Sequence, residues 1–135
     1  MKGHLIEKKN EPLYPEEISE VTISWRESSD DEILSSLSCE QVDGRSLRML
    51  QPNCWLNDKI INFYMALLNE RSKVLYRWTK SKRSYFFYSY FLGALIDSEG
   101  MFTYSKVRDW TSNINIFKAE KLFFQCSKKI IGCLL

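Results

Sequence analysis

Histidine is almost absent from this chain of 135 residues, which has one, His4, close to the N-terminus. A Cys₂His₂ zinc site needs two histidines and is excluded, and a Cys–His catalytic pair would have to use His4. Glycine is also scarce: the 5 glycines form no Gly-x-Gly, so the glycine-rich loops that bind dinucleotides or phosphates are missing. The sequence therefore predicts neither a metal nor a cofactor.

No Cys-x-x-Cys occurs among the 4 cysteines, Cys39, Cys54, Cys126 and Cys133, and no secretory segment is recognisable at the N-terminus. Such cysteines are typical of reduced thiols, so a soluble protein of the nucleus or cytoplasm is expected. No membrane span is expected, because the longest apolar stretch, residues 86–96, is far shorter than the ~20 residues that cross a bilayer. The net charge of +2 indicates no particular partner.

Residues 1–30 have the composition of a tail or linker. Their prolines lie among glutamates, and few large apolar residues are available for burial, so a disordered acidic tail is expected. After this tail, the pattern predicts a short helix over residues 32–37, a turn at Gly44 and a weakly alternating segment over residues 46–50.

The strongest local signal is Trp55-Leu56-Asn57-Asp58, which is followed by apolar residues at helical spacing. Asn57 is a favourable N-cap, and Asp58 in the first turn complements the positive end of the helix dipole. The apolar residues occupy more than one stripe, so this helix is predicted to be buried on most sides and to end near Glu70-Arg71.

Residues 71–83 are rich in lysine and arginine and contain no acidic residue, and a dense aromatic run follows in residues 85–91. Basic residues beside aromatic ones can indicate binding of single-stranded nucleic acid. A solvated loop that leads into a buried aromatic strand accounts better for the small net charge, so no nucleic-acid partner is expected. Further on, the spacing predicts a helix over residues 105–110 and a final strand within residues 114–124.

Four motifs, in this order, resemble the SUMO-specific (sentrin-specific, ubiquitin-like-protein-specific) cysteine proteases. The first is Trp-Leu-Asn-Asp with the Ile-x-Phe-Tyr-Met helix that it opens, within residues 47–72. The others are Phe86-Phe87-Tyr88, the segment 104–111 with its Arg-x-Trp-Thr ending, and the segment 115–124. The resemblance covers residues 31–124, which correspond to the N-terminal half of the family's catalytic domain.

The resemblance implies an α+β, papain-like cysteine protease fold that is incomplete, with the N-terminal helical portion and the first strands. Members of this family cut after the Gly-Gly tail of a ubiquitin-like modifier, so SUMO or a related modifier and its conjugates are the implied partners. By similarity, Trp55 would form one wall of the tunnel around the Gly-Gly, and Asp58 would pair with an arginine of the modifier. Without the resemblance, Trp55 packing on its helix and Asp58 complementing the helix dipole are sufficient explanations.

After Phe124 the sequence departs from the family pattern. The family's His-Trp pair, its aspartate and its Gln- and Cys-bearing segment do not occur in residues 125–135, and His4 lies in the polar tail. Cys126 and Cys133 would therefore lack a base that forms the thiolate, so no catalytic residue is assigned and inactivity is expected. Because an offset reading frame could restore Pro-Val and His-Trp, we interpret residues 125–135 as an out-of-frame tail.

Two functions follow from the sequence and stay open at this point. The chain is either a fragment of a SUMO-type deconjugating isopeptidase that is inactive alone, or a non-catalytic module that binds a ubiquitin-like modifier through Trp55 and Asp58. An incomplete domain leaves apolar faces uncovered, so poor solubility or a molten state is expected for the isolated chain.

Overall fold

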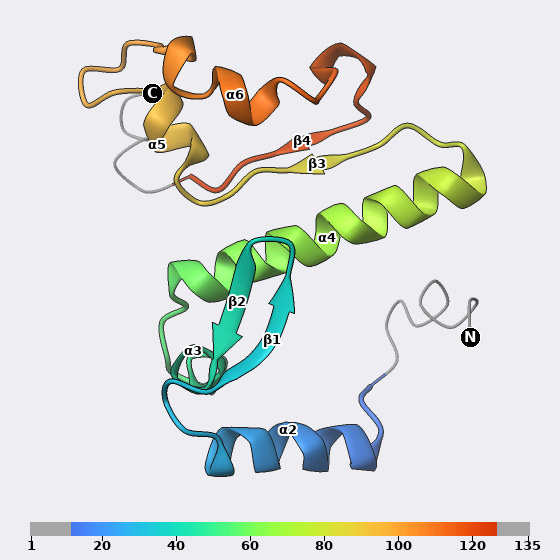
Figure 1. Ribbon diagram of the computed structural model, residues 1–135, viewed down its shortest axis with the longest axis vertical. Coiled ribbons are helices and arrows are strands. Elements are labelled where there is room, and N and C mark those ends of the chain that lie inside the picture. Colours follow the sequence, from blue (N-terminus) through green and yellow to red (C-terminus); the bar gives the residue numbers. More distant parts are fainter. Residues whose placement is uncertain (1–11, 127–135) are drawn as a thin grey trace.

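The computed structural model describes residues 12–126, and its elements are arranged around the long helix α4, Asp58–Thr79. The hairpin of β1 (Ile33–Leu37) and β2 (Glu40–Asp43) lies on one side of α4, and the strands β3 and β4 lie on the other (Figure 1). The mixture of helices and strands agrees with the predicted α+β class. The remaining elements are β3 (Tyr85–Phe86), β4 (Leu122–Phe123), α2 (Pro15–Glu27), α3 (Gly44–Arg48), α5 (Phe91–Leu95), α6 (Arg108–Thr111), η1 (Tyr104–Lys106) and η2 (Ile116–Lys118).

The β1–β2 hairpin replaces the short helix predicted over residues 32–37, which was wrong. The two strands pair antiparallel, with Leu37 opposite Glu40 across a tight turn in which Ser38 has a φ of 56°. Val42 of β2 is 4% exposed and is part of the buried core. Pairing with β2 and packing against α4 decide the conformation of β1, and neither is visible in a local pattern of six residues.

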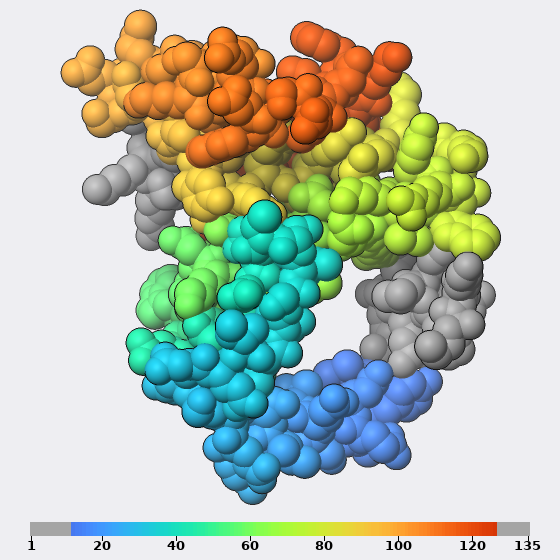
Figure 2. All heavy atoms as spheres, in the orientation of Figure 1, coloured from blue at the N-terminus to red at the C-terminus, as the bar shows by residue number. Residues whose placement is uncertain are grey.

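Helix α2 differs from the disordered tail predicted over residues 1–30. Proline at the first helical position and glutamates in the first turn favour a helix start, and Glu17 accepts a hydrogen bond from the Tyr14 amide at 2.9 Å. Trp25 fixes the helix to α3, because its indole Nε1 donates to the Leu47 carbonyl at 3.1 Å. No residue of α2 is buried, and its N-terminal part stands apart from α4 (Figure 2).

Helix α4 begins where the sequence predicts, with the Asn57 side chain accepting the Ile60 amide at 3.0 Å. Its predicted end near Glu70-Arg71 was wrong, because the helix continues to Thr79 and stops at Lys80, which is left-handed with a φ of 56°. The loop predicted for residues 71–83 is therefore wrong for residues 71–79 and agrees with the structure only over residues 80–83. Lysine and arginine are good helix formers and are favourable near a C-terminus, so a run of them does not end a helix.

The prediction that α4 is buried on most sides agrees with the middle of the helix. Its buried residues are spread around the helix axis, at Ile60, Asn62, Ala66 and Ser72. An exposed stripe runs along Tyr64, Leu67, Arg71 and Val74 at helical spacing. Asn62 accepts the amide of Ser89 at 2.9 Å, so the buried residues of α4 include a polar anchor for a later loop as well as apolar contacts.

The aromatic run contributes to a second core around Phe87, Phe91 and Val107, which is 1% exposed. Strand β3 pairs in parallel with β4, and Phe86 stacks on Phe123 with ring centroids 4.5 Å apart. The strand predicted within residues 114–124 is confirmed over β4, whereas residues 116–118 form η2. The helix predicted over residues 105–110 corresponds to η1 and α6, which are separated at Val107.

Large apolar side chains stay exposed on both sides of α4. Trp55 and Phe117 are each 92% exposed, and Phe102 is 70% exposed. A groove of about 670 Å³ opens beside the second core, lined by Phe87, Leu122 and Phe124 among others. Exposed apolar surface of this extent is unusual for a soluble monomer and indicates surfaces that other groups would cover.

We therefore expect the isolated chain to bind the dye 8-anilinonaphthalene-1-sulfonate strongly and to unfold over a broad temperature range. The reason is that the buried apolar core is small compared with the exposed apolar surface. Dye fluorescence and a thermal scan by circular dichroism check this expectation. A sharp, cooperative transition of a monomer with no dye binding would contradict it.

The substitution Lys80→Gly should strengthen the last turn of α4, because glycine adopts the left-handed conformation of Lys80 without steric cost. We expect amide hydrogen exchange in that turn to slow by about twofold to fivefold, because the cost of ~1–2 kcal/mol for a left-handed lysine is only partly offset by the larger entropy that glycine loses on folding. Lys73→Gly, inside the same helix, is the matched control and should accelerate exchange. Equal effects of the two glycines would refute this explanation.

Candidate functional site

The start of α4 is fixed by a side chain that serves two helices. Asn57 caps α4 with its Oδ1, and its Nδ2 donates to Ser46 Oγ at 3.1 Å. Ser46 is 1% exposed and lies in α3, so the hydrogen bond joins the beginnings of α3 and α4. The segment between these helices therefore has both of its ends anchored, and it carries Trp55 and Leu56 next to the cap.

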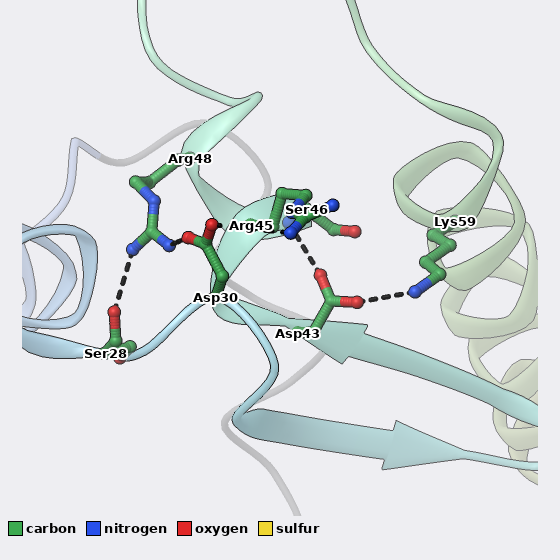
Figure 3. A network of polar contacts seen from close by, with 7 residues as sticks. All are labelled: Ser28, Asp30, Asp43, Arg45, Ser46, Arg48 and Lys59. Atoms are coloured by element: carbon green, nitrogen blue, oxygen red, sulfur yellow. Dashed lines mark hydrogen bonds and ion pairs between the residues drawn. The ribbon is translucent and has the colours of Figure 1, made fainter.

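Asp43 connects the same junction to the hairpin. Its Oδ1 accepts the Ser46 amide at 2.7 Å and so caps α3, while its Oδ2 lies 2.5 Å from the Lys59 ammonium nitrogen in the first turn of α4 (Figure 3). The Asp43 side chain is only 16% exposed. Lys59 above all, and then Ser46, hold the pKa of the Asp43 carboxyl far below its usual range.

A neighbouring ion-pair group fixes the connection between α2 and α3. Asp30 pairs with Arg48 and with Arg45, the latter at 3.5 Å, and Arg48 also donates to the Ser28 carbonyl at 2.9 Å (Figure 3). Arg45 and Asp30 are largely solvent-exposed, so this group is held mainly by the Arg48 contacts. Together with Asp43 and Lys59, it surrounds α3 with matched charges.

The two residues that the sequence singles out, Trp55 and Asp58, both lie at this fixed and exposed junction. Trp55 is 92% exposed, so it does not pack on its own helix, which was the alternative to a role in modifier binding. Asp58 is exposed in the first turn of α4, as complementation of the helix dipole requires. Within residues 12–126, the Asp58 carboxylate makes no ion pair.

An apolar groove of about 560 Å³ begins beside this junction. Leu56 and Ile60 line it at and just before the start of α4, Val42 lines it from β2, and Gln125 is also among its lining residues. Among the residues that the structure describes, the buried side-chain Oε1 of Gln125 has no hydrogen-bond partner. The junction therefore presents an aromatic ring and a carboxylate next to an apolar surface.

The described residues show no assembled catalytic group. Cys39, Cys54 and Cys126 are free and exposed, and the chain's one histidine, His4, lies outside the described residues, as does Cys133. Over residues 12–126 no cluster of histidine, cysteine and carboxylate side chains is arranged to hold a metal ion, and no helix is long and apolar enough to cross a membrane.

Comparison with known proteins identifies the protein family to which this chain is similar. Residues 54–128 match the family described as "Ulp1 protease family, C-terminal catalytic domain". The chain is 37% identical over 103 residues to Ubiquitin-like-specific protease 1A of Arabidopsis thaliana, covering 75% of this chain and 20% of that protein. It is 36% identical over 100 residues to Sentrin-specific protease 2 of Mus musculus, covering 74% of this chain and 16% of that protein. A similar match, 34% identical over 103 residues, is found with Sentrin-specific protease 2 of Homo sapiens.

These matches define a cysteine protease domain of the kind found in proteases specific for ubiquitin-like proteins. The chain belongs to the Ulp1 protease family, and the match lies in its C-terminal catalytic domain. The resemblance read from the four motifs is thereby confirmed. The chain spans about a fifth of the length of the curated relatives that it matches, so the activity of those whole proteins is not assigned to it directly.

Sequence reasoning missed the residues that position the junction, namely Asp43, Ser46 and Lys59. One signal was available: Asp43 lies three residues before Ser46, which is the spacing of an N-cap and the amide that it accepts. The ion pair between Asp43 and Lys59 had no such signal, because it joins residues 16 positions apart.

We predict that Lys59→Met raises the pKa of Asp43 towards its usual range, because Lys59 is the main cause of its lowering. Because the pKa of Asp43 is lower in the folded state, its ionised carboxylate stabilises the fold at any pH above the unfolded-state pKa of about 4. This stabilisation is lost as the pH falls through the folded-state pKa. The junction should therefore be intact at neutral pH and weaken only in acid. A titration of the carboxyl ¹³C resonance measures this pKa, and Lys73→Met, on the same helix, should leave it unchanged. An unshifted Asp43 in Lys59→Met would refute the assignment.

Proposed function

We propose that this chain binds a ubiquitin-like modifier of the SUMO type, through Trp55 and Asp58, as part of a deconjugating protease domain with a papain-like fold. The observation that carries the proposal is the exposure of Trp55, at 92%, on a segment anchored at both ends. A large indole held in water on a fixed backbone costs free energy unless a partner covers it. The names of the relatives support a ubiquitin-like protein as that partner.

The chemistry of the two side chains fits an extended tail with a basic residue nearby. A flat indole packs well over a backbone without side chains, as in Gly-Gly, because nothing projects between the ring and the peptide planes. The Asp58 carboxylate, without an ion-pair partner in the described part of the chain, can accept a guanidinium in a two-point hydrogen bond. Trp55 would then select the tail, and Asp58 would set its register.

We further propose that the chain recognises the modifier without cleaving its conjugates. Attack by cysteine needs a thiolate and a base positioned to generate it, and the sequence offers His4 alone as an imidazole base. On this view the non-catalytic module and the inactive isopeptidase fragment share the same recognition surface. They differ in whether a catalytic segment acts beside it.

Titration of the full chain with purified SUMO tests the proposal. We expect saturable binding that weakens by at least about tenfold in Trp55→Ala and by about threefold to tenfold in Asp58→Asn, as for a central aromatic anchor and an interfacial ion pair. Trp78→Ala and Asp109→Asn are the controls, because Trp78 and Asp109 are also exposed but lie away from the junction. They should bind as the unaltered chain does.

A cleavage assay with a SUMO conjugate accompanies the titration. No product is expected from the chain as its sequence stands, and a version with the offset reading frame restored after Phe124 would regain cleavage if the isopeptidase interpretation is right. Absence of SUMO binding, or equal losses in the control variants, would refute the proposed recognition surface. Cleavage by the unaltered chain would refute the proposed inactivity.

A further inference from the structure

The ion pair of Asp43 with Lys59 bears directly on the charge that the candidate site presents. Lys59 follows Asp58 in the first turn of α4, so a lysine is the sequence neighbour of the residue whose carboxylate is proposed to meet the modifier. Neighbouring residues on a helix point in different directions, and Lys59 is directed towards Asp43 on the α3 side of the junction (Figure 3). The pair is close, at 2.5 Å, and its carboxylate is largely withdrawn from water.

We propose that Asp43 is a positioning residue for modifier binding: it holds and neutralises Lys59, so that the Asp58 carboxylate is presented to the partner without a competing cation. This inference rests on the proposed function of Trp55 and Asp58. It adds Asp43, at the boundary of β2 and α3, to the residues that determine binding. In this role Asp43 acts through Lys59 and does not itself contact the modifier.

The surrounding charges support this role. Asp30 is matched by Arg45 and Arg48, and Asp43 is matched by Lys59. Of the cations in these ion pairs, Lys59 is the nearest to Asp58 in sequence, and its partner is Asp43. If Asp43 lost its charge, Lys59 would keep one positive charge on a flexible stem beside Asp58. It would then pair with Asp58 or repel the arginine that Asp58 is proposed to bind.

One substitution separates this electrostatic role from the structural role of Asp43. Asn is as good an N-cap as Asp, so Asp43→Asn keeps the acceptor for the Ser46 amide and removes only the charge. Adding Lys59→Met removes the freed cation while keeping an aliphatic stem of similar length. The double variant should therefore restore the local charge without restoring the ion pair.

The experiment is a titration of four full-length chains with purified SUMO at low and at moderate salt. Asp43→Asn should bind about threefold to tenfold more weakly at low salt, with a smaller loss at higher salt, because exposed charges are screened. Asp43→Asn with Lys59→Met should recover to within about twofold of the unaltered chain. Glu70→Gln is the matched control, since it breaks the Glu70–Lys73 pair of the same helix and should bind normally.

Unchanged binding of Asp43→Asn would overturn the inference, and so would a loss that the double variant does not recover, because that loss would be structural. A second measurement needs no modifier: the NMR resonance of the Lys59 ammonium group should shift in Asp43→Asn and stay in place in Glu70→Gln. An unshifted resonance overturns the inference while leaving the proposed function intact. If the unaltered chain does not bind SUMO although the resonance shifts, the proposed function fails and the inference fails with it.

Discussion

The hydrogen bond from Asn57 to the buried hydroxyl of Ser46 is the contact on which the rest of the arrangement depends. It joins the N-cap residue of α4 to the first turn of α3, and α4 in turn separates the β1–β2 hairpin from the β3–β4 pair (Figure 1). Because each cap satisfies backbone amides that would otherwise be unpaired, the junction fixes the backbone of the segment between the helices as well as the helices. That segment includes Trp55.

Under the proposed function, binding and folding share residues in this protein. Asn57 and Asp43 support the fold through their caps, and the same groups hold Trp55 and the charge environment of Asp58. The apolar groove that starts at Leu56 and the groove lined by Phe124 add to the apolar surface that the described residues leave exposed. The match of residues 54–128 to the catalytic domain of the Ulp1 protease family includes the Trp55–Asp58 segment and most of these apolar surfaces.

Features that depend on neighbouring residues could be predicted from the sequence, whereas features that depend on distant segments could not. Asn57 as the cap of α4 and Asp58 in its first turn were predicted correctly, because a cap and the amides that it accepts lie within three residues. The end of α4 was placed too early, since basic residues were taken as loop formers although they favour a helix C-terminus. The strand β1 was mistaken for a helix, because its pairing with β2 and its packing beside α4 are not written in its own residues.

The sequence by itself determined the family, through motifs that depend on residue identity and order, and it determined the capped start of α4, through local hydrogen bonding. Only the tertiary structure decided that Trp55 is left in water, that one stripe of α4 stays exposed, and that Asp43 pairs with Lys59. Exposure depends on every segment that could cover a side chain. An ion pair between residues 16 positions apart depends on how a hairpin, a short helix and a long helix come together. Both are properties of the packed chain, because no local pattern specifies which distant segment lies against which.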